Sequence, residues 1–219
     1  MRDLSGFKQI AFYVDMTLCT GCKACMVVCK DKHDLDVGVS WRRVVEYTGG
    51  EWIKEGDAFR QDIFSYYLSV SCNHCSTPIC VESCPSTAMH KNDNGIVSLD
   101  QNKCVGCRYC QWGCPYGAPQ YDKKKGHMTK CDFCTDYLAE GKDPACVAAC
   151  PTRALDFGEF EELKQKSGAI NGLAPLPEAE LTEPSLVLRP HRNGKPVGSD
   201  TGRISNPEEV RWNPTNGLW

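Results

Sequence analysis

The chain has 219 residues, 41% of them hydrophobic and 24% charged, which is enough for one or two compact cores. No run approaches the roughly 18 apolar residues of a membrane-spanning helix, and residues 1–8 lack the basic and then apolar order of a secretory signal, so we expect neither feature in this chain. The formal net charge is −3 when all sixteen cysteines are counted as neutral thiols.

The first predicted elements are short strands. A run of β-branched and aromatic residues predicts a strand at 10–14. The alternating run 41–47 is followed by Gly49-Gly50 and then by 51–53, which predicts a hairpin that turns at the glycines. Another strand is predicted at 64–68.

Hairpins also dominate the middle of the chain. Polar turns predict that 87–90 pairs with 96–99, and that 118–121 pairs with 127–130. A short amphipathic helix is predicted near 159–166.

The last part of the chain has a different composition. Seven of the thirteen prolines fall between Pro175 and Pro214 with little periodicity, so this tail is predicted to be extended and unable to build its own core. A strap over a partner subunit and a loose solvated tail are both open interpretations.

The sixteen cysteines form four groups of four, and none is left over. The first and third groups have the spacing C-x2-C-x2-C-x3-C, the second has C-x2-C-x4-C-x3-C, and eleven residues separate the second and third cysteines of the fourth. A proline follows every group except the first, which Lys30 follows. The groups are Cys19, Cys22, Cys25 and Cys29; Cys72, Cys75, Cys80 and Cys84; Cys104, Cys107, Cys110 and Cys114; and Cys131, Cys134, Cys146 and Cys150.

This spacing suits iron–sulfur cubanes. Two-residue gaps let a tight loop place three sulfur ligands around one cluster, with backbone N–H groups turned toward the cluster sulfur atoms. The spacing therefore predicts four [4Fe-4S] clusters. With sixteen thiolates and four +2 cores the net charge becomes about −11, which argues against a nucleic-acid partner.

Three other interpretations of the cysteines compete with this one. A disulfide scaffold is usually short and secreted, and closely spaced triplets are poorly placed to pair internally. Structural zinc uses two separated C-x2-C pairs, which only the fourth group resembles. One degenerate group, or one three-iron cluster among cubanes, also stays open.

In two-cluster ferredoxins the last cysteine of each motif binds the neighbouring cluster. The second and third groups lie close in sequence, so we expect them to exchange last ligands, and by elimination the first and fourth groups do the same. The predicted ligand sets are Cys19, Cys22, Cys25 and Cys150; Cys72, Cys75, Cys80 and Cys114; Cys104, Cys107, Cys110 and Cys84; and Cys131, Cys134, Cys146 and Cys29.

These patterns predict an α+β fold of interleaved bacterial ferredoxin-like modules with short β-hairpins, small helices and an extended C-terminal tail. We expect one two-cluster module from residues 1–35 with 122–165 and another from 66–121. A β-hairpin insertion at 36–65 and a Pro-rich tail at 166–219 complete the predicted organisation.

Other polar residues give weaker signals. His74 lies inside the second group, which already has four thiolates, so a supporting or surface role is favoured over ligation. The lysines at 123–125 are either a solvated face or a docking surface, and Arg42-Arg43 is interpreted as a structural or interface pair. No nucleophile triad, carboxylate pair or nucleotide-binding glycine pattern occurs, so we expect no catalytic activity in this chain.

The arrangement resembles the four-cluster ferredoxin-like subunits of molybdopterin oxidoreductases, and most closely the iron–sulfur subunits B of anaerobic dimethyl sulfoxide reductases. The resemblance covers most of the sequence. It is carried by Cys19-Thr20-Gly21-Cys22-Lys23, Ser71-Cys72-Asn73-His74-Cys75, Gly106-Cys107-Arg108-Tyr109-Cys110, Cys114-Pro115-Tyr116-Gly117-Ala118-Pro119 and Lys125-Gly126-His127-Met128-Thr129-Lys130-Cys131.

The resemblance implies an electron-transfer subunit of anaerobic respiration, placed between a quinol-oxidising membrane anchor subunit and a molybdopterin catalytic subunit. It implies membrane association through the anchor, on the periplasmic face by export together with the catalytic subunit. Nitrate reductase relatives have tryptophan in place of the second cysteine of the third group; Cys107 is present here, which favours four complete cubanes. Polysulfide, thiosulfate, tetrathionate and nitrite reductase complexes are alternatives with the same relay role.

Overall fold

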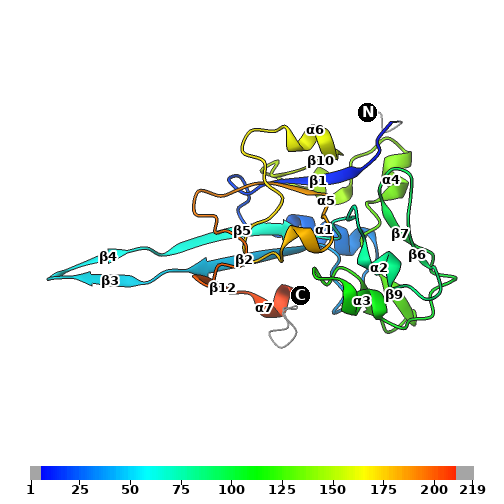
Figure 1. Cartoon of the computed structure of the whole chain (residues 1–219), viewed down its shortest axis with the longest axis horizontal. Helices are drawn as coiled ribbons and strands as arrows, with labels where there is room; N and C mark the ends of the chain where they lie inside the picture. The colour runs from blue at the N-terminus through cyan, green and yellow to red at the C-terminus, as the bar shows by residue number, and fades with distance from the viewer. Residues whose placement is uncertain (1–5, 211–219) are drawn as a thin grey trace.

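A computed structural model describes residues 6–210 of the chain (Figure 1). Its elements form two three-stranded sheets, three two-stranded hairpins and several short helices. In chain order they are β1 (Ile10–Asp15), α1 (Ala24–Lys32), β2 (Arg43–Gly49), β3 (Trp52–Glu55), β4 (Ala58–Gln61), β5 (Phe64–Val70), α2 (Ile79–Glu82), β6 (Met89–Lys91), β7 (Val97–Leu99), α3 (Tyr109–Gly113), β8 (Gln120–Asp122), β9 (His127–Thr129), α4 (Thr135–Ala139), α5 (Ala145–Ala148), β10 (Leu155–Glu159), α6 (Phe160–Lys164), η1 (Ala179–Leu181), β11 (Leu186–Arg189), β12 (Gly202–Ile204) and α7 (Pro207–Val210).

The first sheet has β1 at its centre, antiparallel to β10 and parallel to β11. All six residues of β1 are buried, as expected for a continuous apolar run in a central strand. Phe12 and Val14 belong to the main core, whereas Ala11 and Tyr13 pack with Leu163 of α6 on the other face. The beginning of the chain is thus joined to segments more than 140 residues away.

The second sheet extends into a long arm. β2 pairs with β5 and with β12, and β3–β4 continue the arm outward, as Figure 1 shows at its left side. The predicted turn at Gly49-Gly50 is wrong, because β3 pairs with β4 and the chain turns at Gly56 and Asp57. Gly50 has a φ of +82°, and a Cβ there would lie 2.3 Å from the carbonyl oxygen of Asp62, so these glycines permit close strand approach instead.

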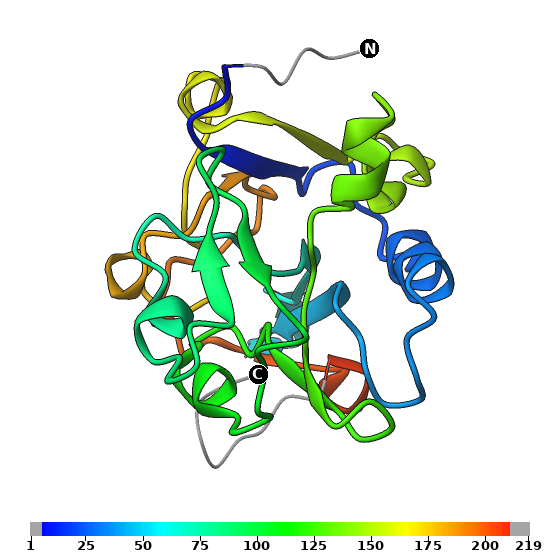
Figure 2. The ribbon, with the colours of Figure 1, turned by 90° about the vertical axis from the view of Figure 1, so that its right-hand side faces the viewer.

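The hairpins β6–β7 and β8–β9 lie at the opposite end of the molecule with α2 and α3 (Figure 2). Met89, Val97 and Met128 form a small second core there together with Cys80 and Cys110. Both hairpins lie at the predicted positions within one or two residues. None of the helices within residues 6–210 has the length and apolar character needed to cross a bilayer.

The described part of the tail, residues 167–210, contains two short strands and packs on the rest of the molecule. β11 is the parallel edge of the first sheet, and Leu186, Val187 and Leu188 are all buried. β12 is an edge of the second sheet, and α7 buries Val210. Residues 211–219, with the last of the prolines, lie outside the described residues.

Candidate metal centres

All sixteen cysteines are free thiols in the structure, so the disulfide interpretation finds no support. Ten are buried and four are partly buried. Only Cys22 and Cys107 are exposed. Free buried thiols can pack as small apolar groups, but quartets of them at metal-ligand spacing indicate thiolate–metal bonds.

The first and third groups have the same loop conformation. Gly21 and Lys23 have φ values of +69° and +63°, and Gly106 and Arg108 have +69° and +67°. The glycines are also sterically required: a Cβ at Gly21 would lie 2.5 Å from the Tyr67 ring. Left-handed residues in tight loops are typical of backbone nests, in which N–H groups face an anion.

The first group lacks the proline that follows the last cysteine of the other three, and the chain leaves it differently. Three residues after the last cysteine of the second, third and fourth groups, Thr87, Gly117 and Arg153 have positive φ values between +53° and +56°. In each case a proline follows the cysteine and ends the helical turn. Lys30 takes that place in the first group, and α1 continues to Lys32.

Cys19 in the first group has a close neighbour from the fourth. Burial is the main reason that the pKa of Cys19 is raised to about 11. The thiolates that raise this pKa further are those of Cys25, Cys150 and Cys22. The last cysteine of the fourth group therefore lies beside the first triplet.

Cys29 shows the reciprocal relation. Its pKa is raised to about 12, first by burial and then mainly by the thiolate of Cys146, with Cys134 adding to the effect. Burial also raises the pKa of Cys131 far above its ordinary value, and Cys29 is the thiolate that adds most to this shift. The last cysteine of the first group therefore lies among the first three of the fourth.

The second triplet lies beside Cys114. Burial raises the pKa of Cys75 to about 12, and the thiolates of Cys72 and Cys114 contribute in the same direction. The pKa of Cys80 is also raised, by burial first and then by the same two thiolates. The last cysteine of the third group is thus a neighbour of the second.

The third triplet lies beside Cys84. The pKa of Cys110 is raised to about 12 by burial and then by the thiolates of Cys104, Cys84 and Cys107. The pKa of Cys84 itself is lowered: burial opposes this shift, but hydrogen-bond donors, led by the Met89 N–H at 3.4 Å from Sγ, outweigh it. Such N–H···S bonds favour a thiolate, as a metal ligand requires.

The thiol clusters fit positively charged iron–sulfur cores. In each group of neighbours, burial and mutual repulsion raise the pKa of at least one thiol, as for Cys19, Cys29, Cys75 and Cys110, and so disfavour the thiolate when no metal is bound. A cationic core reverses both effects, because it neutralises the thiolates where water is excluded.

Two histidines have contacts that their spacing does not indicate. His74 is buried, so the surface role considered from the sequence is wrong; the Val97 N–H donates to its Nδ1 at 3.0 Å. His33 Nε2 lies 3.5 Å from Cys134 Sγ, although 101 positions separate the two residues. Neither contact gives a signal in sequence, because it depends on tertiary packing.

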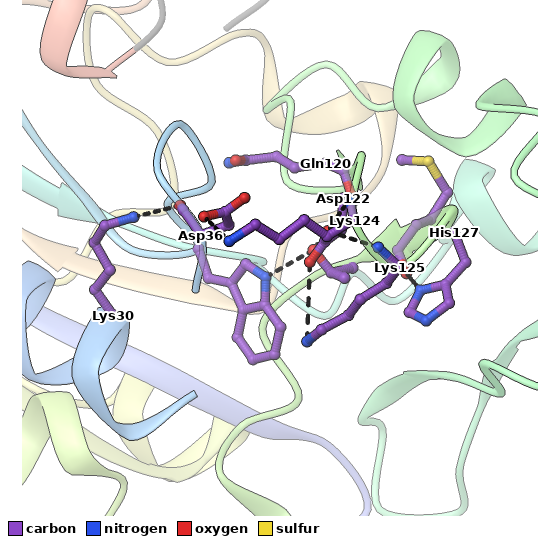
Figure 3. A network of polar contacts seen from close by, with 10 residues as sticks. Lys30, Asp36, Gln120, Asp122, Lys124, Lys125 and His127 are labelled. Carbon is purple, nitrogen blue, oxygen red and sulfur yellow. Dashed lines mark hydrogen bonds and ion pairs between the residues drawn. The ribbon is translucent and has the colours of Figure 1, made fainter. Parts of the chain in front are cut away.

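Of the lysines at 123–125, Lys124 and Lys125 belong to a polar network on the surface (Figure 3). Lys124 Nζ lies 2.8 Å from Asp36, and Lys125 Nζ lies 3.8 Å from Asp122. Lys30 donates to the carbonyl oxygens of Asp36 and Val39, so the network fastens the loop after α1 to the β8–β9 hairpin. These contacts favour a structural role for Lys124 and Lys125.

Paired cysteine groups on a ferredoxin-like scaffold define an electron-transfer protein that binds several [4Fe-4S] clusters. Residues 63–160 match the family described as "4Fe-4S dicluster domain". The sequence is 54% identical to the probable anaerobic dimethyl sulfoxide reductase subunit YnfG of Escherichia coli K12 and 53% identical to the B subunit of the anaerobic dimethyl sulfoxide reductase of the same strain, with 92% of this chain and 98% of each relative covered. It is 36% identical to the B subunit of the polysulfide reductase of Wolinella succinogenes, over 85% of this chain and 97% of that protein.

This protein belongs to the family of iron–sulfur B subunits of anaerobic dimethyl sulfoxide reductases. Its role is to transfer electrons, and it is not the catalytic subunit.

Proposed function

We propose that this chain relays electrons through four [4Fe-4S] clusters, from a quinol-oxidising membrane anchor subunit to a molybdopterin catalytic subunit that reduces dimethyl sulfoxide. The observation that carries this proposal is that the last cysteine of each group is an electrostatic neighbour of another group's cysteines, which supports four closed quartets.

The four proposed sites exchange their last ligands in pairs. Thiolate neighbours from two different groups support each quartet. Site 1 is Cys19, Cys22, Cys25 and Cys150; site 2 is Cys72, Cys75, Cys80 and Cys114; site 3 is Cys104, Cys107, Cys110 and Cys84; and site 4 is Cys131, Cys134, Cys146 and Cys29.

The neighbours of these sites support a linear order of 1, 4, 2 and 3. Cys146 of site 4 contributes to the raised pKa of Cys25 in site 1, and Cys72 of site 2 contributes to that of Cys131 in site 4. The exposed cysteines, Cys22 and Cys107, belong to the two terminal sites. A series with exposed ends and a buried middle suits a carrier that exchanges electrons with two different partners.

The proposed modules follow the same pairing. Residues 1–35 with 122–165 hold sites 1 and 4, and the packing of α1 on α5 and the β1–β10 pair support this unit. Residues 66–121 hold sites 2 and 3, supported by the packing of α2 on α3. Residues 36–65 form the inserted arm, and residues 166–219 are the tail.

Electron flow through the native complex tests the relay. The complex is purified anaerobically, reduced with a menaquinol analogue and followed by EPR during addition of dimethyl sulfoxide. We expect quinol to reduce the clusters and dimethyl sulfoxide to reoxidise them. Clusters that quinol cannot reduce would contradict the proposal.

The relation to the B subunit of polysulfide reductase supports one alternative substrate. Reoxidation by polysulfide, and not by dimethyl sulfoxide, would favour it. The periplasmic side is part of the proposal, and protease access to this chain in spheroplasts compared with inverted vesicles tests it.

A further inference from the structure

Arg42 is a buried cation that forms no ion pair with any carboxylate in the described part of the chain. It lies immediately before β2 and is 2% exposed. Its Nη1 and Nη2 donate to the hydroxyl oxygens of Ser69 and Ser71 at 3.1 and 2.9 Å. Its guanidinium carbon lies 4.4 Å from the centre of the Phe12 ring. Within residues 6–210, no carboxylate forms an ion pair with it. Neutral hydroxyls and a ring do not offset a buried charge, so another countercharge is required.

Cysteines of two proposed sites are near Arg42 and would provide negative charge as thiolate ligands. Burial disfavours its charged form, yet its pKa is raised because nearby thiolates outweigh that cost. Those thiolates are Cys146, Cys25, Cys131 and Cys29. One belongs to proposed site 1 and three to proposed site 4.

Direct contacts also tie Arg42 to both sites. Its backbone N–H donates to the sulfur of Cys29. The Ser69 hydroxyl, which accepts from its guanidinium, lies 3.3 Å from Cys25 Sγ. Arg42 therefore lies at the junction of sites 1 and 4.

Residues before Arg42 anchor the backbone that carries it, while Ser69, Ser71 and Phe12 hold its guanidinium. The Ser40 N–H donates to the Gln120 side-chain oxygen at 2.9 Å, and the Gln120 amide donates back to the Ser40 carbonyl at 2.6 Å. Trp41 Nε1 donates to Thr129 Oγ1 at 3.1 Å. Gln120 and Thr129 belong to β8 and β9, the hairpin of the network in Figure 3. A fixed side chain cannot turn toward water when the local charge changes.

We propose that Arg42 is the shared countercharge of sites 1 and 4, a fixed cation that stabilises the reduced state of both clusters and so raises their reduction potentials. Each reduction adds one electron to an already anionic cluster, and a nearby cation lowers the electrostatic cost of that step. The inference rests on the ligand sets proposed above. It does not depend on the terminal substrate, because cluster potentials are measured without turnover.

EPR-monitored redox titration of the anaerobic complex tests this role with Arg42→Gln and Arg42→Lys. Arg60→Gln is the control for loss of an arginine charge, because Arg60 lies in β4, whose residues are all exposed, and pairs with Glu55 at 2.7 Å. For Arg42→Gln we expect two of four clusters to shift to lower potential, by at least tenfold in the equilibrium constant for reduction, or about 59 mV for one electron. Arg42→Lys should shift the same clusters less, and Arg60→Gln should shift none.

Two results would overturn the role of Arg42. One is Arg42→Gln protein with all its clusters and unchanged potentials, and the other is an equal shift of all four. If Arg42→Gln loses iron, the iron content of Arg42→Lys decides: a fully loaded lysine variant supports a charge requirement, whereas an equal loss indicates a purely structural residue and overturns the proposal. A failure of quinol-to-dimethyl sulfoxide transfer in the parent complex would contradict the proposed function and leave these potentials measurable.

Discussion

Replacement of Cys114 tests the exchange of ligands between the second and third groups. Cys114 is 7% exposed, and the thiolate of Cys72 is the charge that most raises its pKa beyond the effect of burial. Serine is a poor iron ligand, so Cys114→Ser removes one of four ligands from the cluster of the second triplet. We expect that cluster to be lost and the cluster of the third triplet to remain.

The expected magnitude follows from four irons per cubane. Iron should fall from about sixteen to about twelve per chain, or to about fifteen if a three-iron cluster survives at the altered site. The assay combines anaerobic iron analysis with EPR of the reduced complex. Cys114→Ser should lose the same signal as Cys75→Ser and retain the signal that Cys107→Ser removes.

Cys84→Ser is the reciprocal control and should remove the signal of the third triplet. If Cys114→Ser instead removed the same signal as Cys107→Ser, each motif would bind its own cluster with all four of its cysteines. The exchange, and the proposed order of sites built on it, would then be wrong.

Three further outcomes are expected. Leu188 in β11 is 0% exposed, so Leu188→Ala should lower the free energy of unfolding by about 2–5 kcal/mol. Leu181 is 59% exposed, so Leu181→Ala should change that free energy by less than about 0.5 kcal/mol. Thermal unfolding followed by circular dichroism measures both variants, and equal effects would contradict the packing of the tail. Gly106→Ala should lose the cluster of the third triplet, because its Cβ would lie 2.7 Å from the Gly126 carbonyl oxygen. In the control Gly126→Ala, the new Cβ meets nothing within 4 Å, so that variant should bear only the strain of a left-handed alanine. An unchanged EPR spectrum in Gly106→Ala would count against the loop geometry. Anaerobic chelation of iron should abolish the cooperative thermal transition, since ten of the sixteen cysteines are buried; an unchanged melting curve would show that the clusters contribute little to the fold.

Local patterns allowed most of the short elements to be predicted. The strand at 10–14 and the hairpins around 92–95 and 123–126 are confirmed, because alternating residues and polar turns determine them over a few positions. The arm was predicted less well. Gly49-Gly50 resembles a hairpin turn in sequence, but a longer pairing of β2 with β5 lets the chain pass through the glycines and turn later.

Long-range packing was beyond the reach of sequence. Proline-rich composition predicts a tail without its own core, but it contains no information about which surface receives β11 and β12. The same limit applies to side chains. His74 lies between Cys72 and Cys75 in sequence, but only the folded structure shows that it is buried, and only the folded structure brings Arg42 close to cysteines.

The most direct test is the metal content and cluster type of the native complex, kept free of oxygen throughout purification. Iron and acid-labile sulfide analysis, corrected for the other subunits and combined with Mössbauer spectroscopy, should give about sixteen irons and sixteen sulfides in this chain, all in cubane clusters. Far fewer irons, or four tightly bound zinc ions in their place, would contradict the assignment of the cysteine quartets as an electron relay.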